Sequence, residues 1–249
     1  MNRDLMLRDK ANTINDTRNY AFTKAYPSAS ISYAVNENTK AKLAYSKRVA
    51  RTTTFKMNPF PEREHAETLE QGDPDLRPEF INLIELGIDK KLSEENSFFA
   101  TAYYRSTKNV INRVNTVYSD NILNRIYSNV GDAKTFGVEF GTQLKLTAKS
   151  DAFIGGNIYH YNLNGSFDNN PVNTNTTVYS FNANANYRFW ENATLQFSIN
   201  YISDRVTAQG EDSRYYTPNL SVQKSFLNDK LKATLQWLNI DMGLLDTNE

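Results

Sequence analysis

Side chains that could perform chemistry are sparse in this 249-residue sequence, and their spacing forms no catalytic set. The absence of cysteine excludes disulfides, thiolate-bound zinc and thiol nucleophiles. The two histidines, His65 and His160, are far apart in the sequence, so it lacks the His-x-x-x-His pair of many zinc sites. Glycine-rich phosphate loops are missing too. We therefore predict that the chain is not an enzyme and has no cofactor, metal or catalytic residue.

One acidic segment offers ligands that a cation would need. Its members are Glu62, Glu64, His65 and Glu67. A solvated surface loop is the stronger interpretation, because charged side chains are mostly exposed to water. A second pair, Asp73 and Asp75, suggests calcium only weakly, since the remaining oxygen ligands of a calcium loop are missing from this stretch.

The composition indicates an architecture more clearly than a reaction. Lys plus Arg and Asp plus Glu are equal at 28 each, which argues against nucleic acid as a partner. The mean hydropathy is −0.62, and no apolar run approaches the roughly 18 residues of a membrane-spanning helix. Yet 15 Tyr and 14 Phe occur among abundant Asn, Thr and Ser. This mixture is typical of strands that are apolar on one face and polar on the other.

Apolar and polar residues alternate along several segments. In 179–189 the odd positions hold Tyr, Phe and Ala, whereas the even positions hold Ser, Asn and Arg. A strand separates these two sets onto opposite faces, but a helix would mix them. Four further segments alternate in the same way: 41–48, 138–146, 193–201 and 231–237. Segments 97–108 and 151–163 carry aromatics in both phases, which leaves their faces unassigned.

These patterns predict long strands. Their ranges are 27–35, 39–50, 80–92, 97–110, 134–147, 151–163, 177–189, 193–205, 214–226 and 231–240. Most exceed the roughly 5–6 residues of an ordinary strand and match the about 9–11 residues that a tilted strand needs to cross a bilayer. Short turns alternate with long connections, and the long ones are 51–79, 111–133, 164–176 and 206–213. Outer-membrane barrels alternate short periplasmic turns with long extracellular loops in this way.

The sequence therefore predicts an all-β fold, an antiparallel up-and-down transmembrane β-barrel. Residues 1–249 form one partial barrel domain, with 1–26 as an outer loop, 27–240 as five β-hairpins and no plug domain. The predicted strands are about ten of the about 22 in a full barrel of the large transporter class. A soluble protein whose hairpins pack as a sandwich is the weaker alternative.

Three stretches resemble one known family. The first runs from Tyr26-Pro27-Ser28 to Lys47-Arg48-Val49-Ala50-Arg51, and the third from Asn129 to Glu139. Between them lie Asn58-Pro59-Phe60 and Gly72-Asp73-Pro74-Asp75-Leu76-Arg77-Pro78-Glu79. The residues of these stretches and the order of the stretches are similar to those of the TonB-dependent receptors, especially the outer-membrane β-barrel branch that is common in Bacteroidetes. Asp73 stands where that family more often has Asn.

The resemblance implies that the chain belongs to a larger import protein. Such receptors move a scarce ligand, which is a ferric siderophore, a glycan or a peptide, across the outer membrane of a Gram-negative cell. A plug domain and TonB are the implied partners, together with outer-membrane lipid, and no nucleic acid is expected. A surface receptor or assembly scaffold that does not transport is the alternative.

Two groups of site residues follow. We expect the family motif Gly72, Asp73, Pro74, Leu76, Arg77, Pro78 and Glu79 to form a rigid junction between a loop and a strand. Each proline fixes its own φ and holds the preceding residue extended. Lys47, Arg48 and Arg51 lie at the outer end of strand 39–50, where they could contact lipopolysaccharide phosphates, a plug domain or an anionic substrate.

Overall fold

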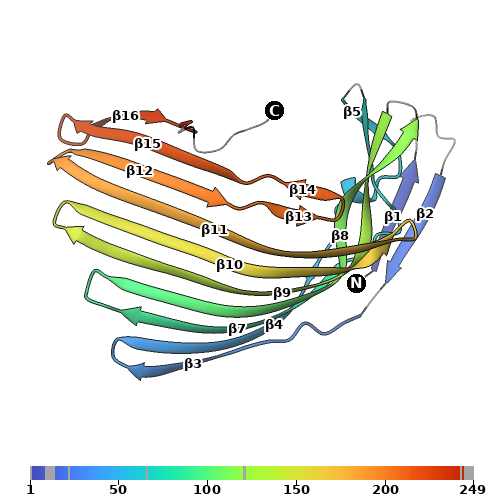
Figure 1. Cartoon of the computed structure of the whole chain (residues 1–249), viewed down its shortest axis with the longest axis horizontal. Coiled ribbons are helices and arrows are strands. Elements are labelled where there is room, and N and C mark those ends of the chain that lie inside the picture. Colours follow the sequence, from blue (N-terminus) through green and yellow to red (C-terminus); the bar gives the residue numbers. More distant parts are fainter. Residues whose placement is uncertain are drawn as a thin grey trace.

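Ten strands follow one another in a curved antiparallel sheet (Figure 1). The structure is a computed structural model, and it describes residues 2–8, 15–21, 23–65, 67–119, 122–241 and 243. The strands, in sheet order, are β3 (Ser28–Asn36), β4 (Thr39–Ala50), β7 (Glu79–Lys91), β8 (Ser97–Ser119), β9 (Ile122–Thr147), β10 (Ser150–Phe167), β11 (Asn170–Trp190), β12 (Ala193–Ile202), β15 (Tyr215–Phe226) and β16 (Leu231–Trp237). The predicted up-and-down all-β fold is confirmed.

Shorter elements occupy the connections at the end of the sheet opposite the short turns. A 3₁₀ turn, η1 (Phe55–Met57), precedes the hairpin of β5 (Glu62–His65) and β6 (Thr68–Gln71). Strand β6 also pairs in parallel with β9, which brings the sheet to twelve strands. Strands β13 (Arg205–Thr207) and β14 (Gly210–Asp212) form a hairpin between β12 and β15.

The predicted outer loop 1–26 contains two strands of its own. These are β1 (Asn2–Arg8) and β2 (Asn15–Ala21), paired antiparallel at the same end of the molecule (Figure 1). Residues 1, 9–14 and 22 of that segment lie outside the described residues. In the part of the chain that the structure describes, no helix is both long and apolar enough to cross a membrane.

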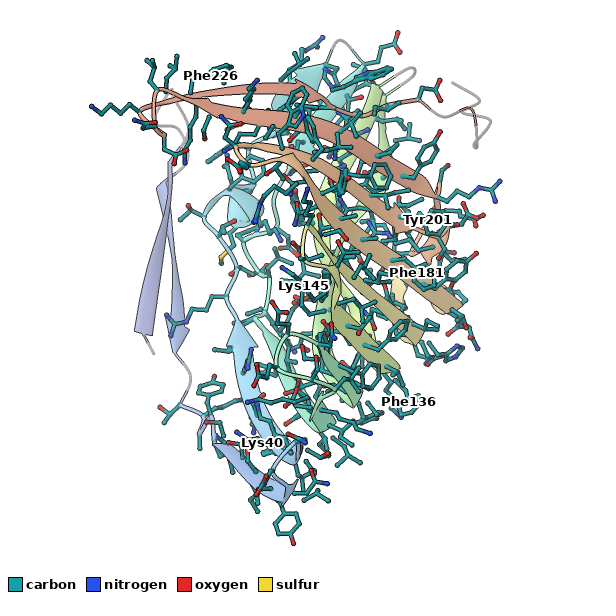
Figure 2. The ribbon with its side chains drawn as sticks, turned by 90° about the vertical axis from the view of Figure 1, so that its left-hand side faces the viewer. Lys40, Phe136, Lys145, Phe181, Tyr201 and Phe226 are labelled. Carbon is teal, nitrogen blue, oxygen red and sulfur yellow. The ribbon has the colours of Figure 1, made fainter. Side chains whose placement is uncertain are left out.

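The strand register gathers the apolar residues on the convex face of the sheet. One row of cross-strand neighbours, from β4 to β11, reads Leu43, Leu86, Ala102, Val138, Ile158 and Tyr179. The adjacent row on the opposite, concave face reads Lys42, Gly87, Thr101, Glu139, Asn157 and Ser180. Figure 2 shows Phe136, Phe181 and Tyr201 on the convex side and Lys145 on the concave side. An apolar outer face and a polar inner face are the pattern of a membrane barrel wall.

Glycines explain why β8 and β10 carry aromatics in both phases. On the concave face, a Cβ added to Gly137 would lie 2.6 Å from the Tyr103 hydroxyl, and one added to Gly141 would lie 2.5 Å from the Phe99 ring. The concave aromatics of these strands therefore occupy the space that side chains at these β9 glycines would need. The convex aromatics, such as Tyr104, belong to the apolar face. The unassigned faces are thus set by neighbouring strands, not by the local sequence.

The predicted long loops 111–133 and 164–176 are largely strand. The β8–β9 pairing continues to Ser119 and Ile122, and β10–β11 closes at Asp168 and Asn169, whose φ angles are 48° and 62°. The prediction of loops is wrong here because alternation ceases once the strands leave the apolar band. We call these tips, together with 51–78 and 203–214, the outer extension, and the rest of the ten strands the wall.

Buried side chains concentrate in the outer extension. One cluster consists of Val114, Val130, Ala133 and Val172 in the outer extension, together with Val110 and Leu163 at the adjoining ends of the wall strands. A second joins Met57 to Leu76, with Ile111 and Tyr127 packed against it. The wall is one residue layer thick and presents large apolar side chains outward, for example Leu86 with 60% of its surface exposed and Leu235 with 76%. The outer extension therefore has an apolar core of its own, whereas the wall needs lipid to cover its apolar face.

Candidate functional site

The Gly72–Glu79 motif begins with a close backbone contact to the segment before β5. The amide of Gly72 donates to the carbonyl of Asn58 (2.6 Å), and that of Asp73 donates to Lys56 (3.0 Å). A Cβ on Gly72 would lie 2.5 Å from backbone atoms of both Lys56 and Asn58, so only glycine fits. The Asp73 carboxylate accepts the amide of Asp75 (2.8 Å), which closes the turn that contains Pro74.

The second half of the motif is tied to β8 and β9. Leu76 is fully buried beside Met57. The backbone of Arg77 exchanges two hydrogen bonds with the Asn129 amide, which accepts at 2.7 Å and donates at 3.0 Å. The carbonyl of Pro78 accepts from Asn109 Nδ2 (3.2 Å), and Glu79 Oε1 accepts from the amide of Ile111 (2.7 Å). The second and third resembling stretches thus join in one junction.

The three basic residues at the end of β4 do not form one site. Lys47 pairs with Asn82 and shares the convex face with Tyr45, whereas Arg48 points to the concave face. Arg51 follows the end of β4 and is exposed. A single anion could not be held by all three side chains.

The acidic segment shows no assembled cation site. Among the described residues, no group of three or more His, Asp or Glu side chains could hold a metal ion. Glu62 accepts a hydrogen bond from Asn58 Nδ2 (3.1 Å), and the side chain of Glu64 lies outside the description. His160 is in the wall, where its Nδ1 contacts Thr177 Oγ1 at 3.1 Å.

A hollow of about 600 Å³ lies at the outer end of the concave face. Tips of β8–β9 and β10–β11 enclose it together with the β13–β14 hairpin. Its charged and aromatic lining residues are Arg113, Arg125, Arg205, Asp212, Tyr159 and Tyr161. Three arginines and one aspartate leave a surplus of positive charge, and the two tyrosines add broad aromatic surface. The hollow is therefore suited to a polar or anionic ligand.

The polar groups of the hollow are only partly satisfied within the protein. Arg205 is paired with Asp212 at 2.7 Å, and Arg113 approaches Glu70 of β6 at 3.7 Å. Asn112 Nδ2 is buried and has no hydrogen-bond partner among the described residues. A buried donor without an acceptor is costly, and Asn112 is also one of the residues that line the hollow.

The β13–β14 hairpin forms one side of the hollow and is held in place by side-chain contacts. Gln209 exchanges two hydrogen bonds with the backbone of Asn115, which mimics a strand pairing to the edge of β8. Thr174 Oγ1 donates to the carbonyl of Thr207 (3.1 Å), and Ala208 packs against the larger apolar cluster. The hollow is thus shaped by segments that are far apart in the sequence.

A second hollow of about 450 Å³ continues down the concave wall and shares Tyr159 and Tyr161 with the first. Here the Tyr103 hydroxyl donates to Asn157 Oδ1 (3.1 Å), and the Arg105 guanidinium lies 5.8 Å from the Tyr103 ring. Together the hollows form a polar, aromatic-lined path from the outer extension toward the lumen face of the wall.

Tyr127 links β9 to the β5–β6 hairpin in the outer extension. Its hydroxyl donates to Glu70 Oε1 at 2.9 Å. Burial raises the pKa of Tyr127, and the hydrogen bond and negative charge of Glu70 act in the same direction. Because Glu70 also approaches Arg113, this network connects the small hairpin to the edge of the larger hollow.

The residues of the larger hollow were not predicted from the sequence. Arg113, Arg125 and Arg205 lie in or beside segments that were predicted as long loops, and nothing in their spacing links them. The only sequence signal was the presence of arginine and tyrosine in connections on the outer side. Their convergence depends on the paired hairpins.

A comparison with known families identifies the chain. The family model described as "Outer membrane protein beta-barrel family" matches residues 4–248. The chain belongs to this family. The predicted outer-membrane localisation is thereby confirmed, and the soluble sandwich is excluded. A search of curated proteins finds no match.

Solved structures share the fold at low sequence identity. The siderophore receptor PirA from Pseudomonas aeruginosa superimposes with a TM-score of 0.61 and 15% identity, over 90% of this chain and 39% of its own. The ferric yersiniabactin uptake receptor FyuA from Yersinia pestis gives a TM-score of 0.61 and 13% identity, over 94% of this chain and 34% of its own. The FrpB iron transporter from Neisseria meningitidis gives a TM-score of 0.58 and 12% identity, over 90% of this chain and 35% of its own. The chain therefore spans between a third and two fifths of each receptor.

Proposed function

We propose that this chain forms part of the wall and outer mouth of a receptor that imports a ligand across the outer membrane. The observation that carries the proposal is the hollow at the outer end of the concave face, lined by Arg113, Arg125 and Arg205. Its position puts it on the side of the wall that faces the lumen, where an incoming ligand would pass. The fold that this chain shares with siderophore and iron receptors also supports a role in import.

Among siderophores, glycans and peptides, an iron-loaded siderophore fits the hollow best. Such ligands offer many oxygen acceptors around the metal, which suit the guanidinium groups and the unpartnered amide of Asn112. The rings of Tyr159 and Tyr161 add surface for an aromatic or apolar portion. This assigns the site to binding and passage rather than to catalysis.

The complete protein would need partners that lie beyond this stretch of wall. We propose a plug domain within the lumen and TonB as the source of energy, as in the receptors that the sequence resembles. Arg48 faces the concave side and is a candidate contact for the plug or the ligand. The Gly72–Glu79 junction would serve indirectly, since it fixes the loop before β7 to the β8–β9 tips that build the hollow.

Uptake by cells that carry the full-length protein tests the proposal. A strain that lacks the gene is complemented with wild type, with R113A/R125A or with R63A/R188A, which removes two arginines away from the hollow. Each strain receives an iron-loaded catecholate siderophore, a labelled oligosaccharide and a labelled peptide. A charge-assisted hydrogen bond contributes about 1.5–3 kcal/mol, so loss of both arginines should lower uptake of the true ligand at least about tenfold.

The expected result is TonB-dependent accumulation of the siderophore, which falls at least about tenfold in R113A/R125A and is retained in R63A/R188A. Binding to the cell surface without TonB-dependent accumulation would contradict import and favour the alternative of a surface receptor or scaffold. Equal uptake by both variants would contradict the assignment of the hollow.

A further inference from the structure

We propose that lysines at the outer rim of the convex face bind phosphate groups on the lipid of the outer leaflet. The lysines are Lys47 of β4, Lys108 of β8 and Lys134 of β9, with Lys24 beside them. The proposal rests on the outer-membrane location of the wall and is independent of the transport function.

The strand register brings two of these lysines into one row. Lys47 pairs with Asn82, Asn82 with Ser106, and Ser106 with Lys134. Three strand spacings of about 4.8 Å therefore separate Lys47 from Lys134. Lys108 lies two residues beyond Ser106, opposite Phe80 on β7. The lysines thus lie on one face, on β4, β8 and β9, with β7 between β4 and β8.

This row lies at the outer boundary of the apolar band. The next row inward consists of Tyr45, Ile84, Tyr104, Phe136 and His160, which is mostly aromatic or apolar. Aromatic girdles mark the membrane interface in outer-membrane barrels. Lysines just beyond such a girdle lie at headgroup level, and their flexible stems reach toward phosphate while the amine stays in a polar layer.

Lys24 places a further amine on the same surface. Its Nζ lies 3.5 Å from the centroid of the Phe80 ring, on the segment that leads into β3. Lys24, Lys108 and Lys134 are exposed and Lys47 is half-buried. The row from Lys47 to Asn162 contains no carboxylate. The nearest one along β9 is Asp132, whose carboxylate already accepts the amide of Asn109 (3.0 Å). Phosphate is therefore the group that complements this surface.

The orientation of the side chains separates this site from the lumen. Arg48 follows Lys47 directly but faces the concave side, so it cannot contribute to a lipid contact. Of the basic residues at the end of β4, the convex geometry selects Lys47 for lipid and leaves Arg48 for the interior. An anionic ligand in the lumen would meet Arg48 and not the lysine row.

Lipid titration of the purified full-length protein in detergent micelles tests the proposal. The variant K47Q/K134Q removes two amines from the outer rim. Its matched control, K90Q/K224Q, removes two lysines from the same convex face at the opposite, inner rim. The thermal midpoint is followed against diphosphorylated lipid A, against the same lipid without phosphates and against inorganic phosphate.

We expect phosphorylated lipid A to raise the thermal midpoint of the wild type and of K90Q/K224Q. The lipid concentration at half-effect should increase about 25-fold in K47Q/K134Q, since each basic residue near an anionic surface contributes a factor of about five. An increase of threefold or more that requires the lipid phosphates supports the proposal. A smaller increase, an equal effect of dephosphorylated lipid, or reproduction of the shift by inorganic phosphate would overturn it.

Discussion

The wall and the outer extension are built from the same strands but are stabilised in opposite ways. Within the wall, strands β8 to β11 form a single layer whose large apolar side chains face outward, and their tips enclose a buried cluster around Val114 and Leu163. In the wall, backbone pairing satisfies polar groups and the apolar face is left for lipid. In the outer extension, apolar side chains are removed from water by one another.

This difference shows that the boundary of the membrane can be located along a single strand. On the convex face of β9, the exposed side chains of Val138 and Phe136 are followed by the exposed charges of Lys134 and Asp132. The surroundings of this face therefore change from lipid to a polar layer between Phe136 and Lys134, whereas Ala133 on the opposite face is buried in the larger apolar cluster. Substitutions in the two regions should therefore have different consequences.

The largest expected effect is that of Gly165→Ala in the outer extension. A Cβ at this position would lie 1.7 Å from the Val130 carbonyl, so β9 and β10 would have to separate at their tips. We expect a loss of about 4 kcal/mol or more in unfolding free energy, measured by urea titration of the full-length protein in micelles. Gly87→Ala in the wall, where the nearest atom is Thr101 Oγ1 at 3.1 Å, is the control and should cost much less. Equal losses of unfolding free energy in the two variants would contradict the difference between the outer extension and the wall.

Leu76→Ala sharpens the comparison by removing one side chain from the smaller apolar cluster. Leu76 is fully buried beside Met57, so we expect a cost of about 3 kcal/mol. Limited proteolysis within 51–78 should accelerate, because this segment depends on the contact. Leu86→Ala, on the lipid-facing side of the wall, should leave the proteolysis rate unchanged. The account fails if Leu86→Ala exposes the segment as strongly.

A charge on either face of β11 tests the wall alone. Phe181 points outward, whereas its neighbour Ser180 points to the concave side. Arginine on the lipid face of a barrel costs about 2–4 kcal/mol near the membrane centre. Phe181→Arg should therefore lower the yield of folded protein in outer membranes, and Ser180→Arg should be tolerated. The reverse ranking would show that the faces are exchanged.

The smallest expected effect is that of Tyr127→Phe, which removes the hydrogen bond to Glu70 and should cost about 1 kcal/mol. The folded-state pKa of Tyr127 is raised, so its stabilising contribution is complete below the ordinary tyrosine pKa of about 10 and is lost as pH rises through the folded value. Unfolding free energy measured across this alkaline range should fall less steeply in Tyr127→Phe than in wild type. An unchanged slope would contradict the contribution of this hydroxyl.

The wall was predictable from the sequence because lipid and lumen impose strict alternation. Segment 179–189 shows this most clearly, and its odd positions all lie on the convex face up to Tyr187. Alternation failed in β8 because Phe99 and Tyr103 lie over glycines of the next strand. A register shift between Thr107 and Val110 then changes the phase at the start of the tip. Neither the glycines of the neighbouring strand nor the register shift can be inferred from a short stretch of the sequence.

The larger hollow was beyond prediction for a related reason. Arg113, Arg125 and Arg205 come from three strands, and Gln209 reaches Asn115 only because the β13–β14 hairpin lies against the β8 tip. The Gly72–Glu79 motif was visible as a resemblance, but its partner Asn129 was identified only by the structure. Pairings between distant segments create sites that spacing in the sequence does not encode.

Accessibility along β11 tests the central claim most directly, namely that the convex face contacts lipid and the concave face the lumen. The chain contains no cysteine, so single cysteines can be placed from 179 to 187 in the full-length protein in outer membranes. Spin labels at Tyr179, Phe181, Ala183 and Ala185 should collide with lipid-soluble oxygen, and those at Ser180, Asn182 and Asn184 with a water-soluble reagent. A strict period of two confirms the wall. Equal accessibility of both sets to the aqueous reagent would contradict it.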